Sequence, residues 1–112
     1  MHELSIAMGI VDIAEKEAKK NGIKEIKTIN LEIGTLSGVE IDALNFAWPM
    51  AVAGSVLENA EKRINIIEAR AKCLDCGTEF KLENLFDACP ECGSYFKEII
   101  QGKEMRVKSL EY

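Results

Sequence analysis

Residues 73–93 read CLDCGTEFKLENLFDACPECG, two matching Cys-x-x-Cys-Gly knuckles with twelve residues between the pairs. Each knuckle forms a tight turn that points two thiolates at one centre, and the glycine after the second cysteine permits the positive-φ backbone that such a turn needs. A short hairpin brings the knuckles together. The spacing therefore predicts a zinc ribbon, in which a structural Zn²⁺ has a closed set of four sulfur ligands, Cys73, Cys76, Cys89 and Cys92.

Other uses of four cysteines were weighed against zinc. Two disulfides would suit a small secreted domain, but the charged stretch after Met1-His2-Glu3 does not look like a secretory leader. A thioredoxin-like dithiol would place one Cys-x-x-Cys early in the chain, whereas here a pair of pairs comes late. Iron fits the same four sulfurs by spacing. A closed four-sulfur site holds the chain together without chemistry, so the function must lie elsewhere.

Composition sets the class of protein. A chain of 112 residues can bury one core and carry a ribbon too small to fold without its metal. The net charge of −5 argues against nucleic acid as a partner, because phosphate binding needs clustered Lys and Arg. No apolar run is long enough to suggest a membrane span. Four thiolates reserved for metal predict a cytoplasmic location, where the environment is reducing.

The first half of the chain alternates between helical and extended patterns. Residues 4–20 form an amphipathic helix by periodicity, and Asn21-Gly22 ends it. Residues 26–33 alternate as a strand does. A second helix is expected over residues 41–53, with a kink or a break near Trp48 because Pro49 lies inside it.

The second half encloses the ribbon between strands. Residues 63–70 predict a strand that runs into the first knuckle, and residues 105–110 predict a third strand that returns to the same sheet. The expected fold is α+β: a two-layer domain of about two helices on a three-stranded sheet (residues 1–70 plus 98–112) with an inserted zinc-ribbon domain (residues 71–97). Short hinges near Ala71 and Lys97 would permit a homodimer by exchange of the ribbon or of the last strand.

The histidine content excludes most enzymes. The only histidine is His2, so no Ser-His-Asp or Cys-His arrangement can be built around a second imidazole. No Gly-x-x-x-x-Gly-Lys-[Ser/Thr] loop is present to hold a nucleotide phosphate. The sequence predicts a protein that is not an enzyme.

Met1-His2-Glu3 is suited to a different task. A histidine at the second position can close a chelate with its own amide nitrogen and the α-amine, an arrangement that suits Ni²⁺ or Cu²⁺. The first N–H groups of a helix have no partner inside the helix, so a metal could take them. The plainer interpretation is an exposed histidine without a ligand, with Glu3 only complementing the helix dipole.

The combination of motifs resembles the HypA/HybF family of nickel metallochaperones in [NiFe]-hydrogenase maturation. The resemblance rests on Met1-His2-Glu3 before an amphipathic helix, a strand ending in Ile33-Gly34, the paired knuckles and the closing stretch Gln-Gly-Lys-Glu-Met-Arg-Val at residues 101–107. It covers the whole chain. One departure is that some relatives have histidines in or beside the knuckles, and this chain has none there.

The resemblance implies a set of ligands and partners. His2 is expected to bind Ni(II) with Met1 and Glu3, Glu40 is a weaker nickel candidate, and the four cysteines hold structural Zn(II). Nickel would be the transferred cargo, delivered together with a nickel-handling GTPase (HypB-like) to the [NiFe]-hydrogenase large subunit. The alternative function is a zinc-ribbon protein-interaction module without nickel binding, and a small redox protein is a further rival.

Overall fold

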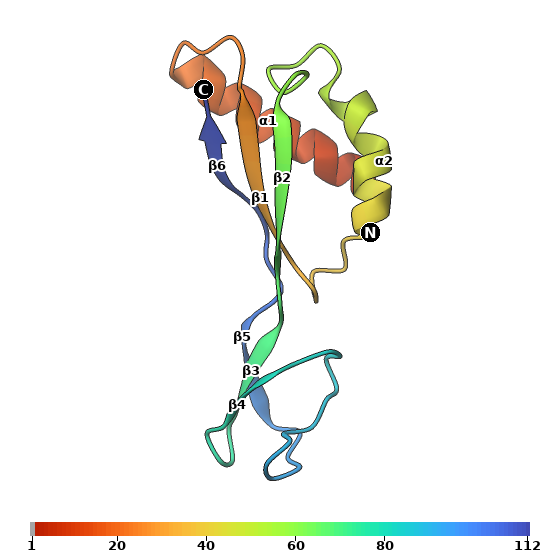
Figure 1. Cartoon of the computed structure of the whole chain (residues 1–112), viewed down its shortest axis with the longest axis vertical. Coiled ribbons are helices and arrows are strands. Elements are labelled where there is room, and N and C mark those ends of the chain that lie inside the picture. The colour runs from red at the N-terminus through yellow and green to blue at the C-terminus, as the bar shows by residue number, and fades with distance from the viewer. Residues whose placement is uncertain (1) are drawn as a thin grey trace.

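The computed structural model describes residues 2–112, which form an elongated molecule of 54 × 26 × 17 Å. Figure 1 shows a helical domain at one end of the long axis and a smaller, helix-free domain at the other. The elements in chain order are α1 (Glu3–Lys20), β1 (Thr28–Gly34), α2 (Ile41–Val52), β2 (Glu61–Ile67), β3 (Arg70–Cys73), β4 (Glu79–Lys81), β5 (Lys97–Gln101) and β6 (Met105–Glu111).

The larger domain is built on a sheet with the strand order β2-β1-β6. Strand β1 pairs in parallel with β2, which follows it through α2, and antiparallel with β6 from the end of the chain. Because β1 is central, its alternate residues Ile29, Leu31 and Ile33 are almost fully buried. The strand expected over residues 105–110 is therefore confirmed as a member of this sheet.

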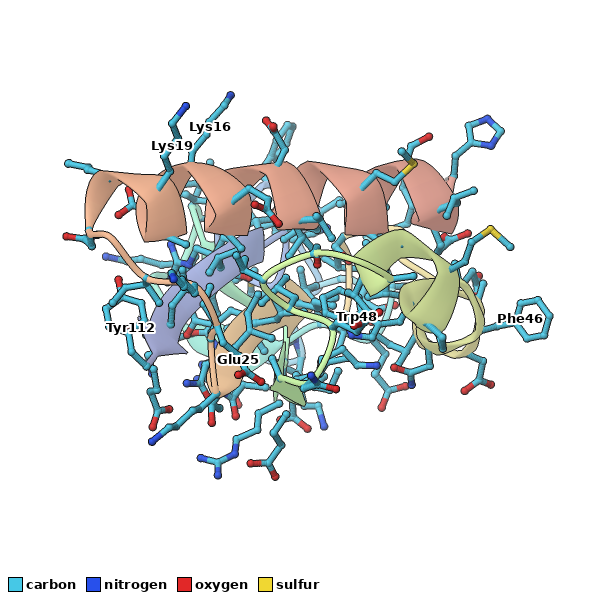
Figure 2. The ribbon with its side chains drawn as sticks, turned by 90° about the horizontal axis from the view of Figure 1, so that it is seen from above. Lys16, Lys19, Glu25, Phe46, Trp48 and Tyr112 are labelled. Carbon is cyan, nitrogen blue, oxygen red and sulfur yellow. The ribbon has the colours of Figure 1, made fainter. Side chains whose placement is uncertain are left out.

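Both helices cover one face of this sheet (Figure 2). Helix α1 turns a stripe of small and branched side chains inward, and α2 adds larger ones, with Trp48 pointing toward the sheet. The buried helical residues are Ala7, Ile10, Ala14, Ala18, Leu44, Trp48 and Val52. Three alanines in α1 let the two helices and the sheet approach closely, so that this layer forms one continuous core.

Helix α2 runs past Pro49. It continues from Ile41 to Val52, all of it within the described residues, so the chain has no break near Trp48, and a kink there stays a prediction. A proline removes one helical hydrogen bond, and here Trp48 and Val52 on either side are buried in the core. Tertiary packing therefore holds the last turn of α2 together.

The smaller domain has its own sheet and core. Strand β3 lies between β4 and β5 and is antiparallel to both. Its interior consists of a few side chains, Ala69, Ala71, Cys73, Phe80, Leu82 and Cys89. The prediction of an α+β fold, with two helices on a three-stranded sheet and an inserted four-cysteine ribbon, is confirmed.

The expected single strand over residues 63–70 is wrong, because the chain divides there. Strand β2 ends at Ile67 and β3 begins at Arg70, with Glu68 and Ala69 between them. The N–H of Ala69 donates to the Thr35 side-chain oxygen at 3.1 Å instead of joining a strand ladder. The two sheets are joined by two links, this bend and the turn between β5 and β6 that contains Gly102. Ala69 is fully buried against Gly102, so the bend is tightly packed.

That second link, between β5 and β6, requires glycine. A Cβ added to Gly34 would lie 2.0 Å from the carbonyl oxygen of Gly102, and one added to Gly102 would lie 2.5 Å from Ala69. Gly102 has φ of 118°, which other residues rarely adopt. The hinges expected near Ala71 and Lys97 lie instead inside paired strands β3 and β5, and the sheets are joined at residues 68–69 and 102–104.

The second sheet begins at Arg70 and its last strand ends at Gln101, while the division into residues 1–70 plus 98–112 and 71–97 stays a prediction. In the part of the chain described, neither helix is both long and apolar enough to span a membrane.

Candidate metal centres

The two knuckles have the same backbone geometry. In each, the N–H of the first cysteine donates to the carbonyl five residues later, at 2.8 Å in both knuckles. The glycine N–H donates back to the carbonyl of that first cysteine, at 2.9 Å for Gly77 and 2.8 Å for Gly93. These glycines have φ of 79° and 75°, the left-handed region that the sequence predicted for them. Both copies of the motif therefore adopt the same turn conformation.

The four sulfurs form one cluster, with all Sγ atoms within 4.8 Å of one another. Sγ of Cys73 lies 3.5 Å from that of Cys92, and Sγ of Cys76 lies 3.6 Å from that of Cys89. Zn–S bonds of about 2.3 Å in a tetrahedron place sulfurs roughly 3.8 Å apart, whereas a disulfide needs about 2.05 Å. The donor set fits a tetrahedral thiophilic ion such as Zn²⁺.

The neighbours of two of these thiols shift their pKa values in opposite directions. The side-chain hydroxyl and the backbone N–H of Thr78 favour the thiolate and lower the pKa of Cys76 to about 6. The backbone N–H of Ser94 lowers that of Cys92, but the neighbouring sulfurs, Cys73 first, raise the pKa of Cys92 to about 12. Four thiolates cannot all ionise at this spacing without a positive charge between them. A metal ion bound between the four sulfurs would supply that charge.

Thr78 and Ser94 were not singled out from the sequence. Each follows a knuckle glycine directly, so their matching positions were the available signal. Thr78 Oγ1 lies 3.2 Å from Sγ of Cys76, and the Ser94 hydroxyl donates to the carboxylate of Asp75 in the opposite knuckle. These side chains connect the sulfur cluster to the turns that carry it.

The second candidate centre lies at the start of α1. His2 is the N-cap residue, with an extended backbone and an exposed side chain, and its carbonyl accepts the first helical hydrogen bond from Ile6 at 3.1 Å. Met1, the other predicted N-terminal ligand, lies outside the described residues. The imidazole of His2 is therefore presented to solvent at a helix end.

Glu3 and Glu40 come together although they are far apart in sequence. The backbone N–H of Glu40, the N-cap residue of α2, donates to Oε2 of Glu3 at 3.1 Å. This hydrogen bond lowers the pKa of the Glu3 carboxyl below its usual value. The Glu40 side chain is exposed. Sequence reasoning suggested that Glu40 lies near the metal but could not show that its backbone holds Glu3.

The two candidate centres lie in different domains (Figure 1). The cysteine cluster is in the ribbon, and His2 with Glu3 is in the helical domain, beside the first turn of α2. One site has a closed set of sulfur donors, and the other combines an exposed imidazole with a half-buried carboxylate.

Comparison with known proteins gives one consistent result. The whole chain, residues 1–112, matches the family described as "Hydrogenase/urease nickel incorporation, metallochaperone, hypA". The hydrogenase maturation factor HypA of Parabacteroides distasonis is 49% identical over 110 residues, covering 98% of this chain and 96% of that protein. The factor of the same name from Azotobacter chroococcum is 42% identical over 111 residues, covering 99% and 98%.

Solved structures give the same match. The solution structure of the Ni metallochaperone HypA from Helicobacter pylori is similar with a TM-score of 0.70 and 31% identity, over 99% of this chain and 97% of that one. A second solution structure of a HypA protein has a TM-score of 0.72 and 32% identity, over 99% and 95%.

Proposed function

This chain belongs to the HypA family of nickel-incorporation metallochaperones for hydrogenase maturation, and we propose that it binds its nickel at the N-terminal Met1-His2-Glu3. The observation that carries this proposal is that an exposed His2 is followed directly by Glu3, whose carboxylate is held by a hydrogen bond from the Glu40 backbone N–H. In this site the His2 imidazole and amide, the Met1 amine and the Glu3 carboxylate would surround Ni(II), with Glu40 as a weaker candidate.

The site is suited to transfer of a metal. His2 is exposed at the end of a helix, so ligands of an acceptor can approach the ion and replace the donors one at a time. The N–H groups in the first turn make no helical hydrogen bonds, and a metal can use them without breaking α1. Copper should bind at least as tightly as nickel by the Irving–Williams order, so the acceptor has to contribute to selectivity.

The ribbon has a structural role in this proposal. Zn(II) would be held by Cys73, Cys76, Cys89 and Cys92, and it supplies the positive charge that allows four crowded thiolates to coexist. All four positions of a tetrahedral ion are then filled by protein, which leaves none for a substrate. We infer that the protein performs no catalysis of its own.

The partners in this proposal are those that the family resemblance implies. Its sequence has no phosphate-binding loop, so any nucleotide hydrolysis has to come from a separate nickel-handling GTPase of the HypB type. The acceptor would be the [NiFe]-hydrogenase large subunit. We place both partner proteins in the cytoplasm, and the proposal requires neither a membrane nor a nucleic acid.

The test compares two forms of the protein, one with the native N-terminus and one with a short peptide added before Met1. Metal analysis should find one zinc in both forms, and titration should find nickel only in the native form, because the extension removes the free α-amine. Zinc in both forms with nickel in neither would favour a zinc-ribbon interaction module. Equal nickel binding by both forms would move the nickel site away from the N-terminus.

A further inference from the structure

The two cysteine knuckles are anchored differently in the ribbon. The first lies in the turn between β3 and β4, whose antiparallel pairing fixes both of its ends. The second lies within residues 82–96, all of them described and none in a helix or strand. Figure 1 shows this segment as a long loop between β4 and β5, at the end of the molecule away from the helices. The second knuckle therefore needs contacts other than a strand ladder to stay beside the first.

Two hydrogen bonds join the first knuckle to the residues that follow the second. The backbone N–H of Leu74 donates to the carbonyl of Phe96 at 3.0 Å, and the Ser94 hydroxyl donates to the Asp75 carboxylate. Oγ of the half-buried Ser94 also accepts from the N–H of Phe96 at 3.1 Å, so its side chain is fixed by the backbone while its proton points to Asp75. The contact between Asp75 and Ser94 is called the knuckle tether below.

The equivalent residues with the knuckles exchanged make no reciprocal contact. Thr78 follows the first knuckle as Ser94 follows the second, and Glu91 occupies the place of Asp75. Thr78 Oγ1 instead lies 3.2 Å from Sγ of Cys76. Within residues 2–112, the exposed Glu91 carboxylate is not a partner in any hydrogen bond or ion pair. The tether is therefore one-sided, and Glu91 is a matched position without it.

The tether joins the residues next to the sulfurs that solvent reaches. In each knuckle the first cysteine is buried and the second is exposed. Asp75 directly precedes the exposed Cys76, and Ser94 comes two residues after the exposed Cys92. A competing ligand has to reach a bound ion from this side, and it gains access when the two knuckles separate here. A contact that keeps the knuckles together at this point therefore protects the ion.

We propose that the knuckle tether slows the loss of the metal ion from the ribbon. Asp75 and Ser94 are positioning residues: neither is a ligand, and they fix the turns that carry Cys76 and Cys92. The protein fills all four positions of a tetrahedral ion, so the ion leaves when the second knuckle moves away from the first. Breaking the tether makes that movement easier and leaves the ligand set unchanged. The inference rests on the structural Zn(II) of the proposed function.

Slow exchange keeps the two metals of the proposed function apart. Thiolates bind several transition metals, and selectivity between metals depends on geometry and availability more than on affinity alone. A ribbon that released its zinc would offer four sulfurs to the nickel cargo. A zinc ion that exchanges slowly keeps these sulfurs occupied while nickel binds and leaves at the N-terminus.

The test measures how fast zinc leaves the full-length protein in an excess of the colorimetric chelator pyridylazoresorcinol. Asp75→Ala removes the acceptor of the tether and Ser94→Ala removes the donor. Each change should increase the rate of zinc loss by about 3-fold or more, the effect of one hydrogen bond to a charged group that is partly exposed. The matched control is Glu91→Ala, which removes a carboxylate from the equivalent place and should leave the rate unchanged.

Three further measurements separate positioning from a general loss of structure. Ser94→Thr keeps the hydroxyl and should retain slow zinc loss. The double variant of Asp75→Ala and Ser94→Ala should lose zinc no faster than the faster single variant, because both changes remove the same hydrogen bond. The absorption spectrum after Co(II) replaces zinc should be the same in every variant, since the four sulfur ligands stay. Trp48 fluorescence checks that the helical domain is folded.

The outcomes distinguish the tether from the zinc site that it serves. Unchanged zinc loss in both Asp75→Ala and Ser94→Ala would overturn the tether. Equal acceleration in Glu91→Ala would overturn it too, because surface charge would then explain the effect, and so would multiplied rates in the double variant. An unaltered protein isolated without zinc would contradict the proposed ribbon metal, and with it this inference. One zinc per chain with equal loss rates would contradict the tether alone.

Discussion

The carboxylate of Glu3 accepts a hydrogen bond from the backbone N–H of Glu40 at 3.1 Å, which ties the first turn of α1 to the N-cap of α2. The contact joins residues 37 positions apart. It lowers the pKa of the Glu3 carboxyl and restrains that side chain beside the first turn of α2, so a residue at an exposed helix start acquires a fixed place. The N-terminal nickel site of the proposed function is therefore partly preorganised by the second helix.

Replacing Glu3 separates its charge from its hydrogen bond. Glu3→Gln retains an oxygen that can accept from the Glu40 N–H, so the helix start should keep its structure while nickel affinity falls by about 10-fold or more. Glu3→Ala loses both and should also increase the exchange rate of the Glu40 amide hydrogen. Nickel titration and amide exchange measure the two effects. Equal nickel affinity in Glu3→Gln and the unaltered protein would remove Glu3 from the ligand set.

Removal of the His2 imidazole should abolish tight nickel binding without affecting the ribbon. Loss of a group that hydrogen-bonds to a metal ligand costs about 10- to 100-fold in metal affinity, so loss of a direct ligand in His2→Ala should exceed about 100-fold. The control is Lys16→Ala, an exposed change further along α1. Isothermal titration gives the affinity, and zinc analysis should give one ion in both variants. Stoichiometric tight nickel in His2→Ala would contradict the proposed site.

Two glycine-to-alanine changes should have opposite effects on stability. Gly34→Ala places a Cβ 2.0 Å from the Gly102 carbonyl oxygen, and neither backbone can move easily, so the free energy of unfolding should fall by about 3 kcal/mol or more. Gly9→Ala meets open space inside a helix and should raise it by up to about 1 kcal/mol. Urea unfolding of both variants checks this. A Gly34→Ala protein as stable as the unaltered one would show that the link between the sheets is loosely packed.

Removal of zinc should unfold the ribbon and leave the helical domain folded. The ribbon core is small and includes Cys73 and Cys89 themselves, so it should not persist without the metal. Trp48, the only tryptophan, lies in the core of the other domain and reports on it by fluorescence. After chelation, amide protection in β3 and β5 should disappear while Trp48 emission stays constant. The control is the same chelator presaturated with zinc, and a simultaneous shift of Trp48 emission would show that the domains unfold together.

Much of this architecture could be predicted because it depends on local pattern. The first helix, expected over residues 4–20, begins one residue earlier, and the strand expected over residues 105–110 is present as β6. The knuckles fold as their spacing indicates, since four cysteines and two glycines leave one arrangement in which all four sulfurs converge. The continuous apolar pattern of residues 63–70 predicts one strand, whereas the break at Ala69 is set by contacts with Thr35 and Gly102.

The sequence by itself determined the four-sulfur centre, the helix that starts at His2 and the family, because each is encoded by residue types at short, fixed spacings. Only the tertiary structure decided that α2 passes Pro49 unbroken, that Gly34 meets Gly102, that Glu40 holds Glu3 and that Gly9 faces an open groove along β6. The physical reason is that these features depend on contacts between segments distant in the chain, and no local pattern specifies which backbone group lies across from which.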